Sequence, residues 1–130
     1  PAQEGYEQVD FETLLTQSDI ISVHAPLNEH TEGLINSKAF EKMKSSCIFL
    51  NLGRGPIVDE QALYNALVRN QIAAAGLDVL CEEPMSADNP LLKLKDSKRL
   101  LITPHIAWAS VEARTHLMEI IHKQVKDFFA

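Results

Sequence analysis

Short apolar runs alternate with longer stretches of mixed polarity along the chain. Four runs are too short for helices and are rich in β-branched or small apolar residues. They predict buried strands at residues 20–24, 48–51, 72–80 and 99–103. A further short strand is predicted at residues 6–9, after a loop at residues 1–5.

The stretches between these strands carry apolar residues at helical spacing. Asp10, Asp59 and Ser110 stand where an N-cap is expected, which predicts helices over residues 11–16, from 59 to about 70, and from 110 onward. A helical segment is also expected before residue 48, and a helical turn at residues 90–94. The predicted buried stripe of the last helix comprises Leu117, Met118, Ile121, Val125 and Phe128.

Strands that alternate with helices pair in parallel, because each connection has to cross back over the sheet. We therefore predict an α/β fold with a parallel sheet and flanking helices. All strands then end at one edge of the sheet.

The composition is that of an ordinary globular domain. The chain has 130 residues, 45% of them hydrophobic and 23% charged, enough for one domain with a core. A net charge of -6, with both signs mixed, argues against nucleic acid or an anionic membrane as partner. We expect no signal peptide and no membrane span. Cys47 and Cys81 are interpreted as reduced thiols of a cytoplasmic protein.

One candidate site lies in the stretch from residue 48 to 59, which reads IFLNLGRGPIVD. Two glycines and a proline surround Arg54, which predicts a tight turn at the carboxyl end of a buried strand. Ligands of open α/β sheets bind at that end. The guanidinium can hold a planar carboxylate through two parallel hydrogen bonds, or it can bond loop carbonyls in a structural turn. The stretch by itself leaves both possibilities open.

Further chemically active residues follow the neighbouring strands. Asp78 ends one strand, with Glu82 and Glu83 just beyond it, and His105 follows the last strand. A carboxylate beside a histidine orients the ring and favours its protonated form, so the ring can deliver a proton. With an arginine to hold the anion, this set suits reduction of a 2-keto acid. The hydride has to come from a nicotinamide or flavin cofactor, because side chains cannot supply one.

Each of these residues also has a structural interpretation. Asp78 could cap a turn, His105 could be a strand-end histidine bonded to a carbonyl, and the two glutamates could be a solvated pair. The remaining histidines show no spacing typical of a metal site, so no metal is predicted. Trp108 is expected to pack rather than to contact a ligand.

Three ordered motifs carry a resemblance to a known family. The segments NLGRGPIVDE, GLDVLCEEP and ITPHIAW, with the earlier SDIISVHAPLNEHT, resemble the D-isomer-specific 2-hydroxyacid dehydrogenases from about residue 19 onward. The segments DNPLL and HIAWASVEAR are most similar to the glycerate dehydrogenase, or hydroxypyruvate reductase, branch. The resemblance implies a partial Rossmann-type, doubly wound sheet that binds NAD, with NADP not excluded.

The resemblance also implies a role for each matching position. Arg54 matches the arginine that grips the substrate carboxylate and carbonyl, His105 the proton donor, and Glu83, rather than Glu82, its carboxylate partner. Asp78 matches the residue that bonds the nicotinamide carboxamide. The other implied cofactor-lining positions, in addition to Arg54 and His105, are Ala25, Pro26, Leu52, Gly53 and Ala107.

The glycine-rich G-x-G-x-x-G loop of such domains occurs nowhere in this chain. We therefore expect residues 1–130 to form the carboxyl-terminal part of a dinucleotide-binding domain, inactive alone, with the substrate domain outside the chain. The expected parent is an oxidoreductase acting on a small 2-keto or 2-hydroxy acid such as hydroxypyruvate or D-glycerate. An unpaired sheet edge predicts a homodimer. The alternative is a dinucleotide-sensing, corepressor-like binding protein.

Overall fold

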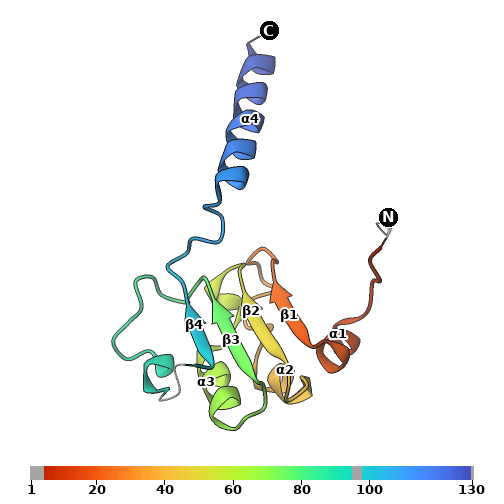
Figure 1. Cartoon of the computed structure of the whole chain (residues 1–130), viewed down its shortest axis with the longest axis vertical. Coiled ribbons are helices and arrows are strands. Elements are labelled where there is room, and N and C mark those ends of the chain that lie inside the picture. The colour runs from red at the N-terminus through yellow and green to blue at the C-terminus, as the bar shows by residue number, and fades with distance from the viewer. Residues whose placement is uncertain (1–4, 95–97, 130) are drawn as a thin grey trace.

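Four parallel strands form a single sheet in the order β1-β2-β3-β4 (Figure 1). The computed structural model describes residues 5–94 and 98–129. The strands are β1 (Ile20–Val23), β2 (Ile48–Asn51), β3 (Ala74–Leu77) and β4 (Leu100–Ile102). The parallel pairing confirms the predicted α/β fold.

The register brings the carboxyl ends of the strands together. Asn51, the last residue of β2, pairs with Val23 of β1 and with Leu77 of β3. Leu77 in turn pairs with Ile102 at the end of β4. The loops that leave these four strands therefore begin side by side along one edge of the sheet.

The helices are α1 (Phe11–Gln17), α2 (Ser37–Lys42), α3 (Glu60–Val68) and α4 (Val111–Phe128), with single 3-10 turns η1 (Gly55–Ile57) and η2 (Pro90–Lys93). Helices α1, α3 and α4 begin where the sequence predicted, and α2 lies in the helical segment expected before residue 48. The Asp10 and Asp59 carboxylates accept the backbone N–H groups of Thr13 and Ala62. Both aspartates are therefore N-caps, which satisfy donors that a helix start leaves free.

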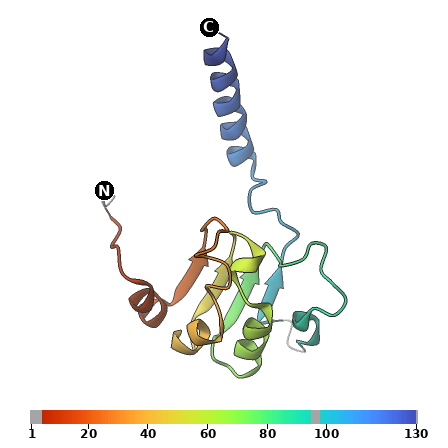
Figure 2. The same ribbon diagram turned by 180° about the vertical axis from the view of Figure 1, so that it is seen from behind.

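The core lies between one face of the sheet and helices α2 and α3, which lie over that face (Figure 2). Phe40 of α2 and Phe49 of β2 are fully buried, with ring centroids 5.4 Å apart in an edge-to-face arrangement. Leu63 and Leu67 of α3 are also fully buried. Such side chains supply most of the hydrophobic stabilisation of a domain.

The opposite face of the sheet is largely open within this chain. Ile20, Ile48 and Leu101, whose side chains point to that face, are exposed, and Ile20 keeps 60% of its surface. In a doubly wound fold both faces carry helices. The described residues thus cover one face of such a sheet.

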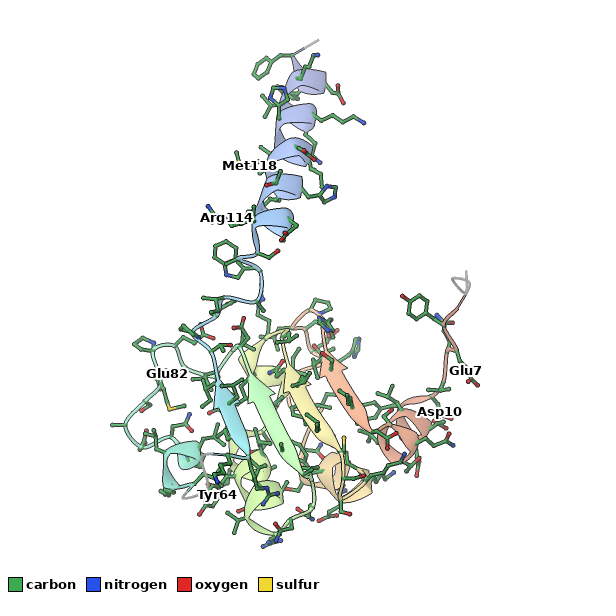
Figure 3. All side chains as sticks on the ribbon, viewed as in Figure 1. Glu7, Asp10, Tyr64, Glu82, Arg114 and Met118 are labelled. Atoms are coloured by element: carbon green, nitrogen blue, oxygen red, sulfur yellow. The ribbon has the colours of Figure 1, made fainter. Side chains whose placement is uncertain are left out.

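The predicted buried stripe of the last helix is wrong. Helix α4 projects away from the sheet domain, and its Arg114 and Met118 side chains extend into open space (Figure 3). Among the described residues α4 has no buried side chain. The amphipathic pattern is real, but the pattern predicts only that a face will be covered and not what covers it.

Three smaller predictions also need correction. Residues 6–9 form no strand, the third strand is confined to Ala74–Leu77, and α3 ends at Val68 rather than near residue 70. Asn70 adopts the left-handed conformation, with φ 56°, which stops a right-handed helix. The loop predicted at residues 1–5 lies, apart from Gly5, outside the described residues. In the described part of the chain, no helix combines the length and apolar character needed to cross a membrane.

Candidate functional site

The turn after β2 is fixed by two hydrogen bonds with the side chain of a buried asparagine. Asn51, 1% exposed, accepts the N–H of Gly53 at its Oδ1 and donates its Nδ2–H to the carbonyl of Arg54, at 3.1 and 3.0 Å. Both bonds close locally, so the turn keeps its shape without help from the ligand side. Arg54 is thereby presented at the sheet edge.

The two glycines of this turn touch the loops on either side. A Cβ on Gly53 would lie 3.0 Å from the carbonyl oxygen of Ala25, in the loop after β1. A Cβ on Gly55 would lie 1.9 Å from the carbonyl oxygen of Leu80, in the loop after β3. Only glycine permits so close a backbone approach. The turn after β2 is therefore in close backbone contact with the loop after β1 and with the loop after β3.

Asp78, one residue past β3, organises the turn after β4. It is 3% exposed, and its Oδ1 accepts bonds from the Thr103 hydroxyl and the Ile106 N–H, while its Oδ2 accepts the Ala107 N–H at 2.8 Å. Burial alone would raise the pKa of Asp78, but the Thr103 hydroxyl and the two amides outweigh it and lower the pKa below its usual range. Asp78 is therefore an anionic anchor inside the site.

That anchor holds His105 in an unusual backbone conformation. His105 has a backbone φ of 55°, in the left-handed region that residues other than glycine rarely adopt. Its N–H donates to the Thr103 carbonyl at 3.0 Å, and its own carbonyl accepts the indole N–H of Trp108 at 2.7 Å. Strained backbone of this kind persists where surrounding bonds enforce it, often at functional sites.

The imidazole of His105 is paired with Glu83. The distance between His105 Nδ1 and Glu83 Oε2 is 2.9 Å, and both side chains are about two-fifths exposed. The other oxygen of Glu83 accepts the backbone N–H of Leu80 at 2.9 Å. The Leu80 amide, followed by the bond to His105, lowers the pKa of Glu83. A carboxylate fixed on Nδ1 leaves Nε2 of the ring available for proton transfer.

Glu83 and His105 also line a hollow. The cavity has a volume of about 470 Å³, and its walls are mainly apolar. Its other lining residues come from the loops after β3 and β4 and from the end of β4: Asp78, Leu80, Pro84, Met85, Ile102, Thr103 and Pro104. A proton donor at the wall of a partly apolar hollow is a usual setting for acid–base chemistry.

Arg54 lines a second hollow on the same edge. This groove, also about 470 Å³, lies between the loop after β1 and the turn after β2, and is lined by His24, Ala25, Pro26, Leu27, Leu52, Gly53 and Arg54. The exposed guanidinium donates to the Gly53 carbonyl at 2.9 Å. Ala25, Pro26, Leu52 and Gly53 are therefore brought together, and the contact of Gly55 with Leu80 joins this groove to the loop that carries Glu83.

Other candidates from the sequence lie outside these contacts. Glu82 is exposed on the loop beyond β3 (Figure 3). Trp108 is 61% exposed, so the prediction that it packs is wrong, and its described contact is the bond to the His105 carbonyl. Within the described ranges, no group of three or more His, Cys, Asp or Glu side chains is placed to hold a metal ion.

Sequence reasoning missed four residues that shape the site. Asn51 and Thr103 hold the two turns, and Glu60 and Asn89 bond to each other across the base of the loop between β3 and η2. Their signal is weak, since a polar residue next to a strand or helix end has several possible partners. The partners of Thr103, Glu60 and Asn89 lie 21 to 29 residues away, so only the fold selects them.

A parallel sheet with a glycine turn and an acid-paired histidine at the carboxyl ends of its strands is the architecture of a dinucleotide-binding α/β domain. Residues 1–107 match the family described as D-isomer specific 2-hydroxyacid dehydrogenase, NAD binding domain, and the chain belongs to this family.

Known relatives agree with this assignment. The chain is 46% identical over 125 residues to the hydroxypyruvate reductase of Blautia hydrogenotrophica, covering 96% of this chain and 38% of that protein. An acyclic imino acid reductase in complex with NADPH and D-Arg superposes with a TM-score of 0.86 and 37% identity, over 99% of this chain and 40% of that one. The D-lactate dehydrogenase of Aquifex aeolicus, complexed with NAD and lactic acid, gives a TM-score of 0.78 and 32% identity, over 93% of this chain and 40% of that one. The chain thus spans about two-fifths of the length of these relatives.

Proposed function

We propose that the protein containing this chain reduces a small 2-keto acid to the D-2-hydroxy acid with NADH, and catalyses the reverse oxidation. The observation that carries this proposal is the 2.9 Å bond between Glu83 and His105 at the edge where the β2 turn presents Arg54. Hydroxypyruvate is the proposed substrate, on the strength of the hydroxypyruvate reductase relative. NADPH is the alternative reductant, because similar structures are in complex with NADPH and with NADP.

In the proposed reaction His105 handles the proton. With Nδ1 bonded to Glu83, the Nε2–H of the protonated ring is left to donate to the carbonyl oxygen of the substrate as this oxygen becomes a hydroxyl. Glu83 holds the ring in one orientation and stabilises its positive charge. In the reverse direction the neutral Nε2 accepts the hydroxyl proton.

Arg54 is proposed to hold the substrate anion. An exposed guanidinium can form two parallel bonds with a carboxylate and also polarise the adjacent carbonyl. Its single described bond, to the Gly53 carbonyl, leaves most of its N–H donors for a ligand.

The nicotinamide cofactor, when bound, supplies the hydride. The groove of Ala25, Pro26, Leu52 and Gly53 is proposed to take a partly polar ligand, because its lining combines apolar side chains with polar atoms. Asp78 is proposed to face the carboxamide. Three N–H and O–H donors already occupy Asp78, which leaves one acceptor position on Oδ2 for such a contact. Ala107 is proposed to contribute backbone next to His105.

The test uses the full-length protein, hydroxypyruvate and NADH, with NADH absorbance as readout. We expect turnover by the wild type and a decrease in kcat of about a thousandfold for His105→Asn, the usual scale for losing a general acid. Glu82→Gln, which removes a charge from the exposed loop, should keep wild-type kcat. Absence of turnover by the wild type, or full activity of His105→Asn, would contradict the proposal.

The 130-residue chain alone is proposed to be inactive. It has no G-x-G-x-x-G loop to bind the pyrophosphate of the cofactor, and its relatives are more than twice as long. The same assay applied to this chain should give no turnover above background. Measurable turnover by the chain would refute this point.

A cytoplasmic homodimer also remains a prediction. Support for self-association comes from β1, an edge strand whose Ile20 is 60% exposed beside the open face of the sheet. Light scattering of the 130-residue chain, in which β1 lies at the edge of the sheet, should give twice the monomer mass. A monomer at micromolar concentration would count against the dimer.

A further inference from the structure

The loop that carries Glu83 is mostly exposed to solvent. It leaves β3 and runs through residues 81–89 to η2, and six of these nine residues are exposed, including Glu83 itself. Loops of this kind are usually mobile unless side chains bind their backbone. A proton-donor pair depends on a fixed geometry, so whatever holds this loop bears directly on the pair.

Glu60, in the first turn of α3, bonds to both ends of this loop. Its Oε1 accepts the backbone N–H of Cys81, and its Oε2 accepts the Nδ2–H of Asn89, both at 2.8 Å. Asn89 is 6% exposed, and its own Oδ1 accepts the N–H of Leu91, so the far end is firmly built into the domain. One carboxylate thus fixes the first and last residues of the loop.

The chemistry of this clamp requires a carboxylate. Both donors are N–H groups, and each approaches a different oxygen of Glu60. An amide side chain offers one oxygen and one NH₂ group, so it can satisfy one of the two donors and must oppose the other. The charge also strengthens both bonds and suits the positive end of α3.

The fixed end of the loop is connected to the pair by adjacent bonds. Cys81 N–H is held by Glu60, the preceding Leu80 N–H donates to Glu83 Oε1, and Glu83 Oε2 meets His105. The same Leu80–Cys81 peptide rests on Gly55. A movement of this peptide would therefore move the donor that orients Glu83.

We propose that Glu60 is a positioning residue for the Glu83–His105 pair, acting through the Leu80–Cys81 peptide and not by contact with substrate. This inference rests on the proposed reduction of 2-keto acids for its kinetic consequence. Its structural consequence, the orientation of Glu83, is independent of that reaction.

The test compares Glu60→Gln with Glu82→Gln in the full-length protein. Glu60→Gln keeps the size of the side chain and removes one of the two clamp bonds, whereas Glu82→Gln removes the same charge from the loop itself. We expect Glu60→Gln to lower kcat about tenfold, the equivalent of one charge-assisted bond, with KM for hydroxypyruvate changed less than about twofold. Glu82→Gln should match the wild type.

A second readout follows Glu83 directly, by titration of its carboxyl carbon in NMR spectra. The Leu80 amide, first, and His105 lower the pKa of Glu83, so Glu60→Gln should raise this pKa toward its ordinary value of 4.5. Asn89→Ser, which breaks only the far end of the clamp, should shift the pKa in the same direction by less. It also serves if Glu60→Gln proves too unstable to study.

A double variant separates positioning from a general effect on stability. If Glu60 acts through Glu83, adding Glu60→Gln to Glu83→Gln should cause no further decrease in kcat. The proposal would be overturned if the double variant lost kcat by the product of the two single losses. It would also be overturned if the pKa of Glu83 in Glu60→Gln and in Asn89→Ser equalled that of the wild type. If the wild type reduces no 2-keto acid, the proposed reaction fails, and the Glu83 titration alone decides the positioning role.

Discussion

Replacing Gly55 by alanine tests whether the Arg54 turn and the Glu83 loop are one rigid unit. The added Cβ would lie 1.9 Å from the Leu80 oxygen, 2.0 Å from the Leu80 carbonyl carbon and 2.4 Å from Cys81 N, where ordinary contact begins at 3.4 Å. All three atoms are backbone, so no side chain can rotate to make room. Either the turn or the Leu80–Cys81 peptide must move.

The expected cost follows from this overlap. Inserting a methyl group into a packed site typically costs about 1–3 kcal/mol, and a clash with the backbone of a neighbouring peptide belongs at the upper end. Alanine also lowers the conformational entropy of the unfolded chain, which offsets about 0.4–1 kcal/mol of this cost. We therefore expect Gly55→Ala to lower the free energy of unfolding by about 2 kcal/mol.

The assay is urea unfolding of the 130-residue chain, followed by circular dichroism, with Gly76→Ala as the matched control. A Cβ on Gly76 would meet only the Cδ2 methyl of Leu50 at 2.9 Å, and this flexible side chain can turn away. We expect the control to change the free energy of unfolding by less than about 1 kcal/mol.

In Gly55→Ala the amide resonances of Leu80, Cys81 and Glu83 should also shift, because the clash displaces their loop. Equal stability of Gly55→Ala and Gly76→Ala, together with unchanged loop resonances, would refute the idea that the two segments are in fixed contact. The pair isolates packing, since both variants add the same methyl group.

Three further predictions concern the core, the anchor and a thiol. Leu67→Ala should cost about 2–5 kcal/mol of unfolding free energy, because Leu67 is fully buried, whereas Leu117→Ala, at a residue 52% exposed on α4, should cost less than about 0.5 kcal/mol in the same urea assay. In the folded protein the pKa of Asp78 is lowered from 3.8, so the charged carboxylate stabilises the fold above pH 3.8. This stabilisation is lost as the pH falls through the folded pKa. The unfolding free energy of Asp78→Asn should therefore decrease less than that of the wild type between about pH 5 and pH 2. Desolvation of the thiol, and after it Glu60, raises the pKa of Cys81 to about 11 from 9.0, so iodoacetamide should alkylate it about a hundredfold more slowly than free cysteine near pH 8, and a rate like that of free cysteine would contradict the raised pKa.

The sequence determined the elements and their order. Short β-branched runs predicted strands in β1, β2 and β4, and the N-caps Asp10, Asp59 and Ser110 marked the starts of three helices. These features depend on residues within a few positions of each other, because a cap or a strand run is a local property. The family motifs could be recognised from the sequence for the same reason, since each is a short continuous segment.

Only the tertiary structure decided which side chains meet. The 2.9 Å contact of His105 Nδ1 with Glu83, the three donors on Asp78 and the bonds of Glu60 to Cys81 and Asn89 join residues 21 to 29 positions apart in sequence. Their meeting depends on the sheet register, which places the loops after β3 and β4 side by side. Helix α4 shows the converse, because an amphipathic pattern marks a face that packs somewhere, and its partner is a matter of three-dimensional arrangement.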